Sequence, residues 1–310
     1  MWFVFAAASS ICFGLRGILY QWTSQRPIHR DPLLFGVFLM GALAALAASL
    51  VTGQAWTRPV WIGVLMGLFS FASNASMYKG FAVGKPSLVA MFTGLPPVVV
   101  VVLAYLFWGE KLNGWQLVSF LVIIAGIILI RYSSDLSLNN LQGAQWGALA
   151  MLFFALNDLT GKQSALLEAA AMPTLTLMFT TGAILFGVVW LLNMRRQAAA
   201  GLDRAVKEIA AAAEEAGSPP AAAADSTKLW SPGRTVLWGM VVGSTNAIGM
   251  MLLMQAFKLG VTGLVSAVVS MNVALILIYA RFVLKEKFSR LELGGLLCVL
   301  TGMILLRLSA

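Results

Sequence analysis

The chain has 310 residues, of which 60% are hydrophobic and only 11% charged, and its formal net charge is +9. Ordinary soluble domains carry about 25% charged residues, so this composition excludes a soluble globular fold and predicts an all-α membrane protein. The positive charge does not indicate a nucleic-acid partner. The basic residues gather at the ends of apolar segments, where the positive-inside rule expects them.

Ten apolar segments follow one another along the chain. A transmembrane helix needs about 20 mostly apolar residues, and segments of this kind lie at residues 1–22, 33–51, 60–82, 87–108, 114–132, 144–165, 173–194, 235–257, 261–284 and 289–308. The first lacks a basic start and carries Arg16 late, which favours a spanning helix over a cleaved signal peptide. We expect a multi-pass protein of the plasma (inner) membrane with the lipid bilayer as its surroundings.

The last third of the chain repeats an earlier part. Residues 63–133 align without a gap on residues 239–309 at an offset of 176 positions, so that Gly63 falls on Gly239. Internal repeats that meet near the bilayer midplane are a recurring architecture of secondary transporters. This repeat is the sequence feature that points most directly to a class of function.

The first segment also has a counterpart, at an offset of 144 positions, which places Trp2 on Trp146. The two offsets differ by 32 residues, so the second half carries an insertion of about that size. The insertion falls in a linker at about 195–234. We therefore expect two five-helix repeats, at residues 1–133 and 144–309, the second of them interrupted by this linker.

Because each repeat has five spans, an odd number, the second must be inverted relative to the first. Charge supports the inversion: fifteen Lys and Arg residues lie in the odd-numbered loops and five on the opposite side. By the positive-inside rule the odd loops, including residues 195–234, are cytoplasmic and both termini face outward.

Several short motifs carry a family resemblance. They are Gly94-Leu95-Pro96-Pro97 and Gly109-Glu110-Lys111-Leu112 in the first repeat, and Ser270-Met271-Asn272 and Lys285-Glu286-Lys287-Phe288 in the second. This arrangement resembles the EamA module of the drug/metabolite transporter superfamily. The resemblance implies a ten-helix secondary transporter of small organic solutes, often an exporter of amino acids or other metabolites.

The chain also departs from this family pattern. Relatives are usually described with cytoplasmic termini, opposite to the charge count, so the orientation stays open. Gly14 stands near the position where small multidrug resistance relatives have a membrane carboxylate.

Asp158 is the most informative polar residue, because a carboxylate in the middle of a span costs about 2.5–3.5 kcal/mol on insertion scales. Asn157 precedes it and Lys162 lies one helical turn later. One interpretation is an i,i+4 ion pair between Asp158 and Lys162 that neutralises both. The other is a coupling role for the two residues, in which Asp158 exchanges protons or pairs with a cationic group on the substrate.

Pro96 and Pro97 should bend or interrupt the fourth span, because they remove two backbone donors. Asn272 lies at the equivalent position in the ninth span. Freed carbonyls at this depth are tolerated against protein or a water-filled cavity. The bend is therefore either a wall of a substrate path or a kink needed for packing.

Asn74 and Asn246 lie near the middles of the third and eighth spans, where each is either a hydrogen bond between helices or a substrate contact. Arg16 is expected to snorkel to the surface. The candidate substrate site is a central cavity between the halves, lined by Asn74, Pro96, Pro97, Asn157, Asp158, Asn246 and Asn272.

The leading function is a secondary transporter that moves a small organic metabolite by alternating access, with protons as a candidate coupling ion. The alternative is a lipid-linked substrate flippase or a non-transporting membrane subunit. An enzyme is not supported, because the only histidine, His29, lies in a loop and no catalytic cluster appears. We expect no metal or cofactor. Gly63-x-x-x-Gly67 and Gly239-x-x-x-Gly243 predict close helix packing, within a monomer or in a homodimer.

Overall fold

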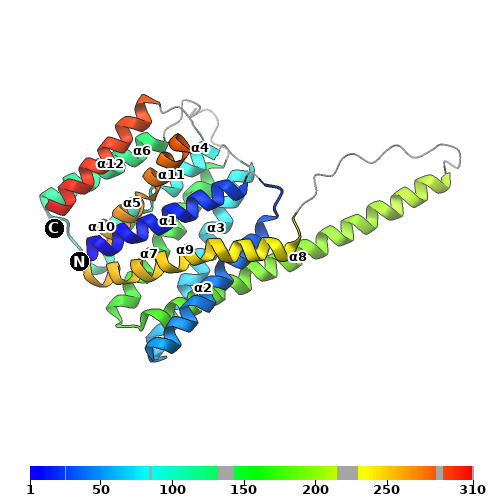
Figure 1. Ribbon diagram of the computed structural model, residues 1–310, viewed down its shortest axis with the longest axis horizontal. Coiled ribbons are helices and arrows are strands. Elements are labelled where there is room, and N and C mark those ends of the chain that lie inside the picture. The colour runs from blue at the N-terminus through cyan, green and yellow to red at the C-terminus, as the bar shows by residue number, and fades with distance from the viewer. Residues whose placement is uncertain (25, 84–85, 132–142, 215–229, 284–288, 309–310) are drawn as a thin grey trace.

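The fold is a bundle of helices, seen in a computed structural model that describes all residues except 25, 84–85, 132–142, 215–229, 284–288 and 309–310 (Figure 1). The repeat ends at 133 and 309 and the middle of the linker fall outside the described residues. No strand occurs in the described part. The helices are α1 (Trp2–Ser24), α2 (Arg30–Thr52), the 3₁₀ helix η1 (Arg58–Trp61), α3 (Ile62–Val83), α4 (Pro86–Thr93), α5 (Pro96–Trp108), α6 (Gly114–Arg131), α7 (Ala144–Leu166), α8 (Ala171–Glu214), α9 (Pro232–Leu259), α10 (Thr262–Val269), α11 (Asn272–Phe282) and α12 (Arg290–Leu308).

Two of the apolar segments are broken helices. The fourth is divided into α4 and α5 by Gly94 and Leu95, and Pro96 and Pro97 occupy the first turn of α5. Proline is favoured there because its missing N–H has no partner in a first turn. The interruption predicted at this proline pair is confirmed.

The ninth segment, expected as one helix over 261–284, is also broken, at Ser270 and Met271. No proline lies at this break, which is why local sequence did not predict it. Shifting the starts of α4 and α5 by 176 positions gives Thr262 and Asn272, the first residues of α10 and α11. The break therefore follows the repeat, and the surrounding packing maintains it without a local helix breaker.

Helices from the two halves are interleaved in the bundle. α3 packs against α7 and α8, while its counterpart α9 packs against α1 and α2. Glycines allow the close approach: a Cβ on Gly63 would meet the carbonyl oxygen of Thr174, and one on Gly239 would meet that of Leu33. The predicted close packing of these small-residue motifs is confirmed, and their glycines face helices of the same chain. α6 and α12 form a further pair, in which Gly126 and Gly295 each approach the other's carbonyl oxygen.

Counterpart helices run in opposite directions. Trp2, at the start of α1, packs at Gly260, and Lys162, near the end of α7, donates a hydrogen bond to the carbonyl oxygen of the same glycine. The start of α1 and the end of its counterpart α7 thus lie at one end of the bundle. Both chain termini are drawn at that end in Figure 1.

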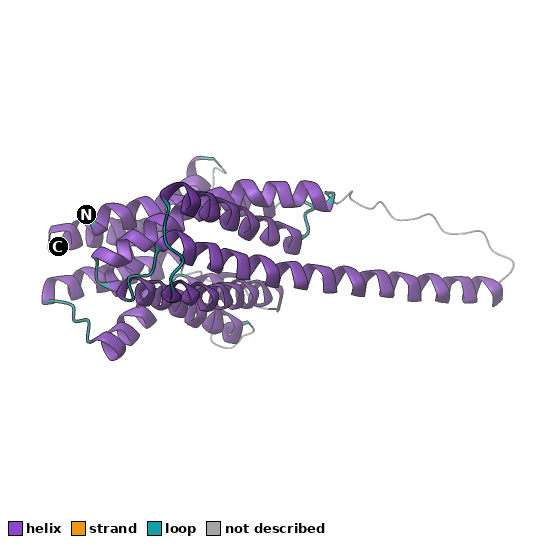
Figure 2. Cartoon of the chain, turned by 90° about the horizontal axis from the view of Figure 1, so that it is seen from below, coloured by secondary structure: helices purple, strands orange, loops and turns teal. Residues whose placement is uncertain are grey.

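α8 is much longer than expected. The seventh span was predicted to end at 194, where a linker was expected to begin, but α8 continues without interruption to Glu214. Figures 1 and 2 show this extension projecting beyond the bundle, away from the chain termini. At about 1.5 Å per residue, residues 195–214 add roughly 30 Å of helix.

Six helices are long and apolar enough to span a membrane, judged by length and composition in the described part of the chain. They are α1, α2, α3 with η1, α8, α9 and α12. Three further apolar stretches are shorter, at Pro96–Trp108, Gly114–Ile130 and Thr262–Ile276. These features agree with a multi-pass membrane protein, and the total of ten spans stays a prediction.

Candidate functional site

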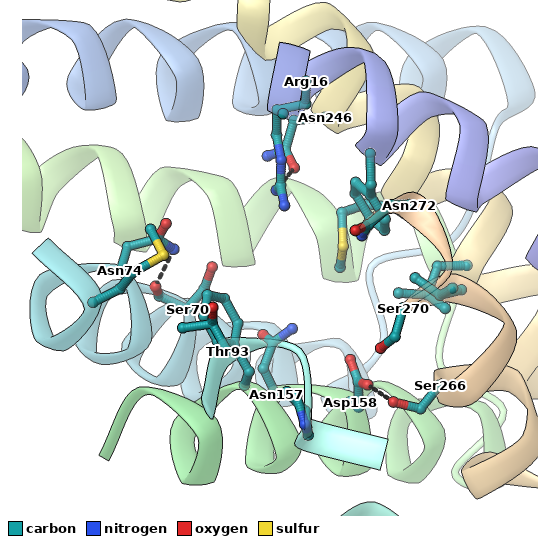
Figure 3. A pocket seen from close by; sticks show the side chains of 18 of the residues that line it. Arg16, Ser70, Asn74, Thr93, Asn157, Asp158, Asn246, Ser266, Ser270 and Asn272 are labelled. Carbon is teal, nitrogen blue, oxygen red and sulfur yellow. Dashed lines mark hydrogen bonds between the residues drawn. The ribbon is translucent and has the colours of Figure 1, made fainter. Parts of the chain in front are cut away.

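A cavity of about 240 Å³, lined by both apolar and polar side chains, lies at the centre of the bundle (Figure 3). Side chains from α1 to α5 of the first half and from α7 to α11 of the second half line it. Many lining residues occupy repeat-equivalent positions, including Ser70 with Asn246 and Pro96 with Asn272. The cavity therefore lies where the two halves face each other.

Six residues singled out from the sequence line this one cavity: Asn74, Pro96, Asn157, Asp158, Asn246 and Asn272. They come from five different helices, so only the fold brings them together. Pro97 is buried in the first turn of α5 but does not line the cavity. Lys162 also lies outside it.

Arg16 points into the cavity, as Figure 3 shows, and does not snorkel to the surface. Its guanidinium donates a hydrogen bond to Asn246 Oδ1 at 2.5 Å and lies over the ring of Phe13, 4.7 Å from the ring centre. The expectation of snorkelling was wrong because α1 lies between α9 and α11, so this face of α1 is covered by protein. Asn246 consequently joins helices from the two halves.

Asp158 lies on the opposite wall, on α7. Its carboxylate accepts a hydrogen bond from the hydroxyl of Ser266 on α10, at 2.6 Å. The neighbouring Asn157 is only 8% exposed, and its Oδ1 has no hydrogen-bond partner among the described residues. In Figure 3 both side chains extend from α7 toward the centre of the cavity. This wall therefore carries a carboxylate beside an amide whose carbonyl oxygen is buried without a hydrogen-bond partner among the described residues.

Lys162 does not pair with Asp158. Its ammonium lies 3.3 Å from Glu110 Oε1 and donates to the carbonyl oxygens of Phe257 and Gly260, at 3.1 and 2.9 Å. The proposed i,i+4 pair was wrong because the Lys162 side chain reaches the end of α9. The carbonyls at a helix C-terminus attract a cation there.

Glu110 extends this contact to α10. The carboxylate accepts hydrogen bonds from the backbone N–H and the hydroxyl of Thr262, at 2.8 and 3.0 Å. It thus lies at the N-terminus of α10, where the helix dipole favours an anion. Glu110 follows Gly109, whose φ of +65° ends α5 in the left-handed conformation that glycine adopts at low cost.

The two halves also meet at the other end of the cavity. Trp22 of α1 packs against Trp238 of α9, with ring centres 4.7 Å apart, and Trp238 donates a hydrogen bond to Thr23. Trp22 further contacts Trp230, at 6.5 Å. The cavity therefore lies between an ionic contact at the end of α9 and an aromatic contact at its start.

Sequence reasoning missed part of the lining. Ser70, Thr93, Ser266 and Ser270 all line the cavity but are small hydroxyl residues that occur throughout apolar helices. Ser270 could have been found from the repeat, because it is the equivalent of Gly94 beside Pro96. Asn74 donates to the carbonyl oxygen of Ser70 within its own helix, at 2.7 Å, and does not join two helices through that bond.

The described residues hold no group of three or more His, Cys, Asp or Glu that could bind a metal ion. Cys12 and Cys298 are free cysteines.

The polar lining can offer an organic solute hydrogen-bond donors from the wall of Arg16 and acceptors from the wall of Asp158.

Comparison with known proteins gives three findings. The model of the EamA-like transporter family matches residues 1–132 and 217–308. An uncharacterized transporter of Bacillus subtilis (strain 168), YxxF, is 30% identical over 121 residues, which is 38% of this chain and 39% of that protein. The match spans about two fifths of that relative's length. A solved crystal structure, described only as a protein, aligns with a TM-score of 0.72 over 99% of this chain and 97% of its own, at 15% identity. This last likeness shows a shared fold alone.

Proposed function

The chain belongs to the EamA-like transporter family, and from this membership we propose that it is a secondary transporter that exports a small organic solute across the plasma membrane. Transport would proceed by alternating access of two inverted five-helix repeats, 1–133 and 144–309. The central cavity between the halves is the proposed substrate site.

The cavity itself is the observation that supports this proposal best. Its polar side chains come from both repeats. Some lie within α1, α3, α7 and α9, and others lie beside the breaks between α4 and α5 and between α10 and α11. Intramembrane polar groups of this kind are costly and mark substrate pathways. The volume of about 240 Å³ is smaller than the roughly 300–1,000 Å³ of drug-sized ligand sites, so a small metabolite fits it best.

The contacts at the two ends of the cavity support alternating access. The ion pair between Glu110 and Lys162 and the packing of Trp22 on Trp238 both join one half to the other. If the halves rock about the cavity, one contact should open while the other closes. Asp158 is the proposed coupling residue, because its carboxylate lies on the cavity wall, where it accepts a hydrogen bond from the hydroxyl of Ser266.

Solute uptake into proteoliposomes tests this function. Purified protein is reconstituted and exposed to a defined mixture of small metabolites, with and without an imposed proton gradient, and the lumen is assayed by mass spectrometry. The proposal expects at least one small solute to enter above the level of protein-free liposomes. Entry of none, together with movement of a fluorescent lipid-linked sugar between leaflets, would instead support the flippase alternative.

A further inference from the structure

A cluster of tryptophan and arginine side chains joins the two halves at the end of the bundle from which the α8 extension projects (Figure 1). Cζ of Arg26 lies over the ring of Trp22, 4.0 Å from the ring centre, and Cζ of Arg234 lies over the ring of Trp230 at the same distance. The two rings meet edge to face, with their centres 6.5 Å apart. Each ring of this pair therefore carries a stacked guanidinium.

Backbone hydrogen bonds hold the cluster in place. Pro27, which follows Arg26, accepts a hydrogen bond from the backbone N–H of Trp230 at 3.0 Å. Ser231 then caps α9 by accepting a hydrogen bond from the backbone N–H of Arg234. Arg26 and Arg234 are therefore held at the same aromatic pair although they belong to different halves of the chain.

Both arginines lie just outside the spans that the sequence predicts, where a bilayer presents its headgroups. Arg26 follows the end of α1, Arg234 lies in the first turn of α9, and both side chains are exposed. Tryptophan is enriched at this depth because one side of its ring system is apolar and its N–H is polar. A lipid headgroup can therefore reach the cluster.

Stacking covers the faces of the guanidiniums but not their edges. The N–H donors of arginine lie in the plane of the group, so a stacked guanidinium can still bind a phosphate through two parallel hydrogen bonds. Among the described residues, neither Arg26 nor Arg234 has an ion pair or a side-chain hydrogen bond. The carboxylate of Asp31, in the first turn of α2, accepts a hydrogen bond from Asn193.

The outer face of α9 continues from the cluster as an apolar surface. Leu237 and Val241 follow Arg234 at helical spacings of three and seven residues, so the three lie on one face, and both apolar side chains are exposed. An acyl chain can lie along this face while its phosphate stays at the arginines. Free phosphate has no such second contact.

We propose that the cluster of Trp22, Arg26, Trp230 and Arg234 binds the headgroup phosphate of an anionic phospholipid. The phosphate accepts hydrogen bonds from both guanidiniums and so joins the first half to the second, beside the packing of Trp22 on Trp238. Basic side chains at the cytoplasmic surface attract anionic lipids in general, and the two stacked guanidiniums give this attraction a fixed place. The proposal does not depend on which solute is transported.

Lipid binding to the purified full chain tests the proposal. Native mass spectrometry compares dioleoylphosphatidylglycerol with dioleoylphosphatidylcholine, which has the same acyl chains, and adds glycerol 3-phosphate as the headgroup without a lipid. The anionic lipid should bind about tenfold more tightly than the zwitterionic one, as expected for a charge-assisted contact. It should also raise the thermal midpoint, because it joins the halves. Glycerol 3-phosphate should neither bind at the same concentration nor displace the lipid.

Variants with equal charge loss assign the site. The double variant Arg26→Gln with Arg234→Gln should lose the preference for the anionic lipid. Arg195→Gln with Arg196→Gln is the matched control, because these arginines lie at the same end on α8 and stack on no ring in the described part of the chain. It should keep most of the preference. Arg26→Lys with Arg234→Lys keeps the charge without the planar fork and should keep only part of it.

Several results would overturn the proposal. An equal loss in the two glutamine double variants would show attraction to the basic end as a whole. Full retention by either double variant of Arg26 and Arg234 would show that the stacked guanidiniums do not bind the headgroup. Displacement by glycerol 3-phosphate would show a site for free phosphate. Thermal midpoints recorded without lipid show which variants are folded, and the lysine variant decides if the glutamine variant is not.

Discussion

The interpretation of Asp158 differs between the sequence and the structure. The sequence supports two interpretations equally: an ion pair with Lys162, or a carboxylate with a function in transport. In the structure Lys162 binds Glu110 and the end of α9, and the Asp158 carboxylate accepts a hydrogen bond from Ser266. The ion-pair interpretation is removed, and a cavity-facing carboxylate remains.

Asp158→Asn should abolish solute accumulation driven by an imposed proton gradient, because an amide cannot take up and release the proton. Exchange at saturating solute should persist, since the amide oxygen still accepts a hydrogen bond. The half-saturating concentration should rise about fivefold for roughly 1 kcal/mol of lost charge assistance. Asp31→Asn is the control, because Asp31 bonds Asn193 and does not line the cavity. Gradient-driven accumulation by Asp158→Asn would refute the coupling role.

The pair formed by Glu110 and Lys162 gives a second prediction at this scale. Lys162→Met should lower stability by about 1–3 kcal/mol, because it leaves the Glu110 carboxylate, whose side chain is 16% exposed, without its cation. Adding Glu110→Gln should recover part of this loss. Denaturant titration of purified protein in mixed micelles measures the effect. The matched control combines Lys162→Met with Asp158→Asn. Because these two side chains do not pair, the stability changes of the two single variants should add to that of the double variant within about 0.5 kcal/mol. If the stability changes of Lys162→Met and Glu110→Gln simply add in the double variant, the assigned contact between Lys162 and Glu110 is contradicted.

At the scale of helices, the sequence could predict most elements but not all their ends. Apolar length located the spanning segments, and Pro96 and Pro97 located the break before α5. The break before α11 has no local signal, and only the offset of 176 positions maps it. Arg16 was misplaced because a helix pattern does not say which neighbour covers a face. The meeting of Asn74, Asn157, Asn246 and Asn272 at one cavity depends on helix packing, which local patterns do not encode.

Close helix contacts explain why certain glycines should not tolerate a side chain. Gly36→Ala should destabilise the protein by about 1–3 kcal/mol, because the new Cβ would meet the carbonyl oxygen of Val236 on α9. Gly294→Ala is the matched control: it is also helical, has no neighbouring atom within 4 Å of its added Cβ, and should gain up to about 1 kcal/mol of helix propensity. Thermal midpoints in detergent compare the two. Equal midpoints would argue against this packing of α2 on α9.

For the molecule as a whole, we propose an orientation in the membrane from the distribution of charge. The chain termini lie at one end of the bundle and the α8 extension projects from the other (Figure 2). Arg195 and Arg196 lie on α8 near that second end, and Arg30, Arg234 and Arg290 lie at the starts of α2, α9 and α12. The positive-inside rule places this end in the cytoplasm, opposite to the orientation that the family resemblance implies.

Cysteine labelling decides the orientation. The background has Cys12 and Cys298 replaced by alanine. In it, Thr57→Cys should react with an impermeant maleimide in intact spheroplasts. Thr57 is exposed, and we place it at the same end of the bundle as the chain termini. Ser218→Cys, in the linker outside the described residues, should react only after permeabilisation. The reverse pattern would show that the termini are cytoplasmic.

The measurement that tests the central claim most directly is solute exchange by a variant whose cavity is filled. Asn272→Phe adds an aromatic ring at the cavity wall, whereas Leu106→Phe adds one on the outer face of α5, where Leu106 is 66% exposed. Both proteins are reconstituted at equal density, with thermal midpoints recorded beforehand. We predict exchange at the level of protein-free liposomes for Asn272→Phe and near the unmodified rate for Leu106→Phe. Exchange at the unmodified rate by a folded Asn272→Phe protein would show that solute does not pass through this cavity.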